Sequence, residues 1–124
     1  PQSVRPWQHV LDCLNGYTLL VEHQLKYGCE GEWNFGPNET ANYKVCDVVE
    51  QLNLQSNMKV ETRIIESKLQ ESKILLLNSQ KSINDLNWNN KLNFENAVKW
   101  TFDWYMDSDK SNATLQQINE FFDL

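Results

Sequence analysis

The first 28 residues constrain the fold most strongly, because an extended segment runs directly into an amphipathic helix. Bulky side chains at positions 4, 7 and 10, together with the proline at position 6, predict a strand over residues 4–10. Apolar side chains then recur at helical spacing, Asp12 suits the first helical turn, and Gly28 suits the residue after a helix end. Gly16 inside this helix predicts a close approach of another element. The apolar positions are Val10, Leu14, Tyr17, Val21 and Leu25.

Beyond this unit, the pattern predicts a mixture of short strands and helices. Strands are expected at residues 32–35, 58–64 and 74–77. Helices are expected after these capping residues: Thr40 or Asn42, Ser79, Asn93, and Thr114 with Gln117 in the capping-box position. The polar stretch 107–112 indicates a hinge. The predicted fold class is therefore α/β, with short strands plus about five helices and no complete doubly wound domain.

Length and charge argue against several classes of protein. The 124 residues suffice for one domain, but not for a nucleotide-binding domain together with a substrate domain. A net charge of −6 and the lack of a Lys/Arg cluster argue against a nucleic-acid partner. No apolar run approaches the roughly 20 residues of a membrane helix, so no membrane association is expected. Three cysteines without metal-ligand spacing predict a cytoplasmic protein without a metal site.

Arg5 is the candidate ligand-binding residue that the local pattern supports best. A guanidinium is a planar fork that matches a phosphate with two hydrogen bonds, and strand ends commonly carry such groups. The alternative is an ordinary surface arginine. His9 shares a face of the predicted strand with Arg5 and Trp7 and is a second candidate, although a half-buried histidine is more often a packing residue.

Trp100 and Trp104 lie four residues apart on one predicted helix and form an aromatic stripe. Such a stripe usually packs against another element rather than a ligand. The C-terminal helix is too short to persist alone in water, so we expect it to dock on this stripe. The predicted organisation is a subdomain over residues 1–112 followed by a docking helix over residues 113–124.

The chain lacks the motifs of a complete catalytic or cofactor site. It contains no G-x-x-G-x-x-G turn, no Tyr-x-x-x-Lys pair, no G-x-S-x-G and no P-loop. No residue is therefore assigned as a catalytic acid, base or nucleophile, and none as a cofactor ligand.

Several colinear blocks of the sequence carry a family resemblance. Residues 5–10 are Arg-Pro-Trp-Gln-His-Val, residues 33–37 are Trp-Asn-Phe-Gly-Pro, and residues 93–98 are Asn-Phe-Glu-Asn-Ala-Val. Together they resemble the carboxy-terminal part of the extended short-chain dehydrogenase/reductase family, and within it the CDP-glucose 4,6-dehydratases. The first block is the specific one, because related sugar-nucleotide enzymes usually show Arg-Asp-Trp or Arg-Asp-Tyr there.

The resemblance implies a function for a longer parent protein. Such an enzyme converts CDP-glucose to CDP-4-keto-6-deoxyglucose with a tightly held NAD, in deoxysugar and O-antigen biosynthesis. Residues 1–112 would be its sugar-nucleotide-binding subdomain, and a Rossmann part with the catalytic residues would precede it. The implied partners are the nucleotide-sugar substrate and that Rossmann part, in a parent expected to form a homo-oligomer. The chain alone is expected to be inactive and not to bind NAD.

The resemblance also implies which residues bind the substrate. Arg5 would contact the diphosphate, His9 would lie nearby, and Gln70 and Glu71 would belong to a polar segment that closes over the nucleotide. The chain departs from the family at Gln70, where a histidine is usual, and at Leu76 and Asn78, and these departures allow another sugar nucleotide. Two alternatives remain: a part of a related epimerase or reductase, or a stand-alone, non-enzymatic binding module.

Overall fold

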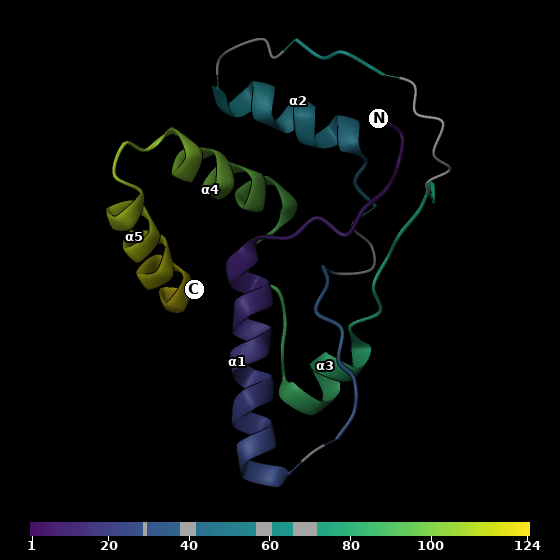
Figure 1. The fold of residues 1–124 in the computed structure, drawn as a ribbon, viewed down its shortest axis with the longest axis vertical. Coiled ribbons are helices and arrows are strands. Elements are labelled where there is room, and N and C mark those ends of the chain that lie inside the picture. The colour runs from purple at the N-terminus through teal and green to yellow at the C-terminus, as the bar shows by residue number, and fades with distance from the viewer. Residues whose placement is uncertain (29, 38–41, 57–60, 66–71) are drawn as a thin grey trace.

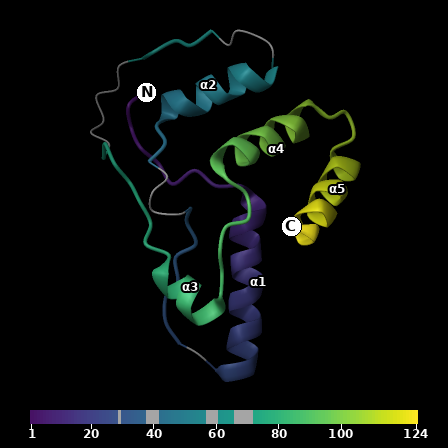
Figure 2. The ribbon, with the colours of Figure 1, turned by 180° about the vertical axis from the view of Figure 1, so that it is seen from behind.

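The computed structural model describes residues 1–28, 30–37, 42–56, 61–65 and 72–124, which form five helices linked by irregular segments. In Figure 1, α1 is the long vertical helix, α3 lies beside its lower half, and α4 and α5 lie near its upper end. α2 packs across α4, and the same neighbours appear from behind in Figure 2. No helix in the described part of the chain is long and apolar enough to cross a membrane. The helices are α1 (Val10–Tyr27), α2 (Val45–Ser56), α3 (Gln80–Leu86), α4 (Phe94–Met106) and α5 (Lys110–Asp123).

Local capping signals located three of these helices correctly. α1 ends at Gly28, which adopts the left-handed conformation (φ 65°) and donates its N–H to the carbonyl of Gln24. α4 begins after Asn93, whose side-chain oxygen accepts from the N–H of Asn96 at 2.9 Å. Ser79 precedes α3 as predicted, although its hydroxyl bonds to the backbone of Gly36 instead of capping the helix.

The predicted starts of the other two helices are wrong. α2 begins at Val45, where Asp47 accepts from the N–H of Lys44 at 2.7 Å. Asn42 therefore does not cap it, and Thr40 lies outside the described residues. α5 begins at Lys110, because Asp109 caps it by accepting from the N–H of Asn112 at 3.1 Å. The expected hinge over residues 107–112 therefore ends in helix, and Thr114 lies inside α5.

A single lysine holds the turn between α4 and α5. Lys110 Nζ donates to the carbonyl oxygens of Trp104, Tyr105 and Asp107 at 2.6, 2.7 and 2.5 Å. The same ammonium lies 5.0 Å from the ring centroid of Trp104. The last carbonyls of a helix have no hydrogen-bond partner within it. Here one side chain bonds two such carbonyls, of Trp104 and Tyr105, and also the carbonyl of Asp107, which follows the helix.

The predicted strands are not formed in the described residues beyond two isolated bridges. Val4 pairs with Lys44 in antiparallel and with Ile74 in parallel orientation, so the strands expected at 4–10 and 74–77 shrink to single rungs. Pro6 has no N–H to donate, and the N–H of Trp7 bonds to the carbonyl of Arg5 at 2.9 Å, which closes a tight turn. Residues 32–35 and 61–64 also form no strand, and residues 58–60 lie outside the described part. The α/β expectation is therefore shown only for its helices.

Two apolar clusters lie on the side of α1 that faces the rest of the chain. One joins Phe35, Leu86 and Trp88 between α1 and α3, with α1 contributing Leu19 and Leu20. The expected close approach at Gly16 is confirmed, since an added Cβ would lie 2.7 Å from Phe35 ring carbons. The other cluster lies between α1, α4 and α5: Leu92, Ala97 and Phe121, with Leu11 and Trp100 against them.

The fully buried carboxylate of Asp12 connects the two clusters. Its oxygens accept from the N–H groups of Lys91 and Leu92 at 2.6 and 3.4 Å. The backbone carbonyl of Asp12 accepts from the indole N–H of Trp88 at 3.0 Å. Burial raises the pKa of the Asp12 carboxyl, and the bonds from Lys91 and Leu92 partly oppose that rise. The first turn of α1 thereby fixes the segment that leads into α4.

We predict that Asp12→Ala lowers the free energy of unfolding by about 2–4 kcal/mol. The substitution leaves the buried N–H of Leu92 and the part-buried N–H of Lys91 without their acceptor, and a buried group in this state costs roughly 1–3 kcal/mol. Urea unfolding followed by tryptophan fluorescence measures the loss. Glu22→Ala, at an exposed position of the same helix, is the control and should change stability by less than about 0.5 kcal/mol. Equal losses for the two variants would contradict the role given to Asp12.

Candidate ligand-binding site

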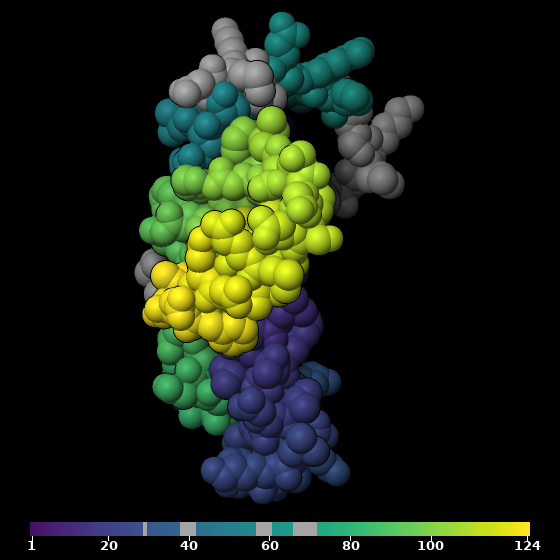
Figure 3. All heavy atoms as spheres, turned by 90° about the vertical axis from the view of Figure 1, so that its left-hand side faces the viewer, coloured from purple at the N-terminus to yellow at the C-terminus, as the bar shows by residue number. Residues whose placement is uncertain are grey.

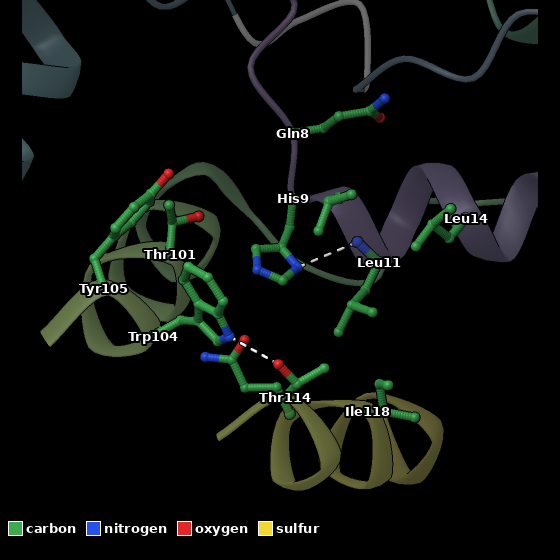
Figure 4. Close-up of a pocket in the computed structure, with 11 residues that line it drawn as sticks. Gln8, His9, Leu11, Leu14, Thr101, Trp104, Tyr105, Thr114 and Ile118 are labelled. Atoms are coloured by element: carbon green, nitrogen blue, oxygen red, sulfur yellow. Dashed lines mark hydrogen bonds between the residues drawn. The ribbon is translucent and has the colours of Figure 1, made fainter. Parts of the chain in front are cut away.

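A cavity of about 510 Å³ opens between the N-terminus of α1 and the facing sides of α4 and α5 (Figure 4). We call it the α1–α4–α5 cavity. Leu11 and Leu14 of α1 and Ile118 of α5 supply apolar walls, and Trp104 and Tyr105 of α4 supply aromatic ones. None of the described residues that line it is charged. Its volume is in the range of small-molecule sites, which are mostly apolar with a few polar groups.

His9 is the titratable side chain at this cavity. It caps α1: its Nδ1 accepts from the N–H of Leu11 at 3.3 Å, which places the ring proton on Nε2. The ring is 4% exposed and lies edge-on to Trp100, with centroids 5.8 Å apart. Burial lowers the pKa of His9 below its ordinary value. In Figure 4 the free edge of the ring faces α4, so His9 offers a neutral N–H donor on that side.

Two further polar residues of the cavity come from α5, and sequence reasoning did not single them out as site residues. The indole N–H of Trp104 donates to the hydroxyl of Thr114 at 2.8 Å. The side-chain amide of Gln117 donates to the carbonyl of Trp100 at 2.7 Å. These bonds confirm that the terminal helix docks on the Trp100–Trp104 stripe. They also hold the walls of the cavity in place.

The structure does not bring the predicted site residues together. Arg5 is half-buried, its guanidinium donates to the carbonyl of Val4 at 2.7 Å, and it does not line the α1–α4–α5 cavity. The expected common face of Arg5, Trp7 and His9 required a strand, and the tight turn at Pro6 replaces it. Gln70 and Glu71 lie outside the described residues, so their predicted role stays a prediction. No described group of three or more His, Cys, Asp or Glu side chains is placed to hold a metal ion.

Comparison with known proteins gives a distant relationship. No protein-family model matches the chain. In an alignment 129 positions long, the chain is 28% identical to CDP-glucose 4,6-dehydratase of Salmonella typhimurium, and the alignment covers 98% of this chain and 36% of that protein. It is 24% identical to UDP-glucose 4-epimerase of Halalkalibacterium halodurans over 112 residues, 90% of this chain and 33% of that protein.

The chain is a distant relative of sugar-nucleotide dehydratases and epimerases. It spans about a third of the length of these two curated relatives. The relationship therefore concerns one part of such proteins, and it sets the class of ligand that is considered below.

We predict that the free energy of unfolding falls as the pH is lowered through about 6.5, and that His9→Asn reduces this dependence. The folded pKa of His9 is lowered, so the unfolded chain takes up a proton at the ordinary value of 6.5 while the folded chain still resists it. The contribution of His9 to the free energy of unfolding is therefore complete above pH 6.5. It is lost as the pH falls from there towards the lower pKa of the folded chain. Asparagine is a good N-cap that does not titrate.

Urea unfolding at pH 7.5 and at pH 5.5 measures this difference for both proteins. The two proteins differ only at position 9, so the comparison isolates His9. Parallel pH profiles for the two proteins would show that His9 is protonated as readily in the folded chain as in the unfolded one.

Proposed function

We propose that this chain is the carboxy-terminal, nucleotide-sugar-binding part of an NAD-dependent CDP-glucose 4,6-dehydratase. The observation that carries the proposal is the alignment of 98% of the chain with a CDP-glucose 4,6-dehydratase. Identity and coverage are both lower for the UDP-glucose 4-epimerase, so a part of a related epimerase is the second candidate. In this proposal, the residues before α5 form the binding subdomain and α5 (Lys110–Asp123) docks against it, which moves the boundary expected at 112/113 to the start of that helix.

An exposed apolar stripe along α1 supports a role inside a larger protein. Five side chains at helical spacing on this helix are 49–85% exposed. In Figure 3, α5 lies below α4, and the lower half of α1 extends beyond both. Contiguous apolar patches of this kind mark surfaces that another protein or domain covers. The stripe consists of Val10 and Leu14, which also line the α1–α4–α5 cavity, and of Tyr17, Val21 and Leu25 beyond it.

Arg5 is the proposed contact to the diphosphate of the substrate. The bridges at Val4 and the bond from the Arg5 N–H to the carbonyl of Tyr43 (3.3 Å) hold the backbone beneath the guanidinium. A positioned guanidinium binds phosphate through charge-assisted hydrogen bonds. His9, Gln70 and Glu71 complete the set of proposed substrate contacts, and the whole parent enzyme would supply the chemistry.

The residues of this chain do not fit the NAD that such an enzyme uses. A dinucleotide site needs glycines that let backbone N–H groups approach a pyrophosphate at a helix N-terminus. The chain has four glycines: Gly16 packs on Phe35 within α1, Gly28 ends α1, and Gly31 and Gly36 lie in irregular segments. None of them opens a helix. We therefore assign no cofactor contact to this chain and propose that NAD binds the remainder of the parent.

Calorimetric titration of the purified chain with CDP-glucose and with UDP-glucose tests the proposed function. We expect saturable binding with a preference for CDP-glucose. A preference for UDP-glucose would favour the epimerase alternative. If neither nucleotide sugar binds, the chain is a binding module of another kind and the proposal is wrong.

We predict that Arg5→Ala weakens CDP-glucose binding by about 1.5–3 kcal/mol, the range for a hydrogen bond to a charged group. Arg63→Ala is the matched control, since Arg63 is the other arginine of the chain and is exposed. Titrations of both variants and the unmodified chain give the difference. Similar losses of CDP-glucose affinity in the two variants would mean that Arg5 acts only through its charge and does not contact the diphosphate.

A further inference from the structure

We infer that the α1–α4–α5 cavity binds an uncharged planar ring that carries a hydrogen-bond acceptor, with the acceptor placed on the Nε2–H of His9. This inference goes beyond the proposed nucleotide-sugar binding and does not depend on it. Three properties of the cavity carry it: the polarity of its walls, the fixed orientation of its polar side chains and its volume.

The walls select against charge. The described lining residues include no acid, lysine or arginine, and leucine, isoleucine, valine and aromatic side chains dominate the surface. Moving an ion from water into such surroundings without a partner is strongly unfavourable. An aromatic ring keeps its favourable transfer from water and gains contacts with Trp104 and Tyr105. The cavity therefore suits a neutral, flat molecule.

His9 supplies a donor of known direction. Its Nδ1 is occupied by the N–H of Leu11, and the ring packs edge-on against Trp100. The remaining nitrogen, Nε2, forms no hydrogen bond within the part of the chain that the structure describes. A ligand acceptor at this position can therefore pair with the ring N–H without displacing a bond within the described chain.

The opposite wall is fixed before any ligand arrives. Trp104 is held by Thr114 through its indole N–H, and Lys110 lies near its ring. Gln117 is held by the carbonyl of Trp100, so α4 and α5 form one wall. Because these side chains are already ordered, a ligand loses less affinity to their immobilisation. At about 510 Å³, the cavity admits one or two fused or substituted rings.

Two neutral probes of the same shape test the role of His9. Acetophenone carries a ketone oxygen, and α-methylstyrene has a methylene group in its place. Chemical-shift changes in ¹H–¹⁵N spectra of the full 124-residue chain report where each probe binds and how tightly. We expect acetophenone to bind at the cavity with a dissociation constant on the order of millimolar. It should bind roughly 3- to 10-fold more tightly than α-methylstyrene, the range for one hydrogen bond.

Three substitutions locate the site. Ile118→Trp fills the cavity from α5 and should abolish acetophenone binding, as should Leu14→Trp from α1. Leu115→Trp lies on the same helix as Ile118 but outside the cavity, and it should bind normally. His9→Asn keeps a capping residue, withdraws the ring N–H and should lower acetophenone affinity to that of α-methylstyrene. Dispersed spectra of each variant establish that it is folded.

Equal affinities for the two probes would overturn the inference, because the cavity would then be a non-specific apolar surface. Normal acetophenone binding by folded Ile118→Trp or Leu14→Trp would place the probe elsewhere and also overturn it. If the unmodified chain shows no saturable probe shift and Ile118→Trp changes the oligomeric state of the protein, the cavity is a contact between proteins and the inference is wrong. His9 also belongs to the proposed substrate contacts, but the CDP-glucose titration uses neither aromatic probe, so loss of probe binding and loss of CDP-glucose binding are distinguished.

Discussion

The buried carboxylate of Asp12 is the interaction on which the arrangement of this chain depends. It lies in the first turn of α1 and accepts from two backbone N–H groups some 80 positions away in the sequence. The segment that it fixes belongs to both apolar clusters, since Trp88 joins the first and Leu92 the second. Burial disfavours the charged form, and the two donors compensate for the lost water. A polar contact thus ties the segment that leads into α4 to the first turn of α1.

Much of the helical structure is visible in the sequence because its determinants are local. Asn93 and Gly28 mark helix ends through bonds that span three or four residues. The strands were not predictable in this way, since a ladder depends on partners far along the chain, and Val4 finds single partners in Lys44 and Ile74. The start of α5 was misplaced for a different reason. Asp109 and Thr114 are both residue types that cap helices. In the structure Asp109 is the cap, so the helix begins earlier in the chain.

The candidate site was only half visible from the sequence. His9 stood out as a residue type, but the burial that lowers its pKa and the bond from the Leu11 N–H to its Nδ1 are visible only in the structure. Thr114 and Gln117 stood out only as a capping-box pair, which does not indicate a site. They become cavity residues because α5 docks on Trp100 and Trp104, a contact between helices that the apolar spacing did predict. Arg5 was chosen for the chemistry of its side chain, which does not reveal whether the backbone around it forms a strand.

The three carbonyl oxygens around Lys110 Nζ also bear on which sequences this turn tolerates. They converge on one point from different directions, which suits an ammonium with three donors arranged around a single atom. A guanidinium spreads its donors across a plane and carries them on a larger head group, so it matches two parallel acceptors and not a pocket of three. Lysine and arginine, exchangeable on most exposed surfaces, are therefore not equivalent at position 110. In related chains with a turn of this length, a lysine directly after the capping aspartate should mark those that close the turn between α4 and α5 in the same way.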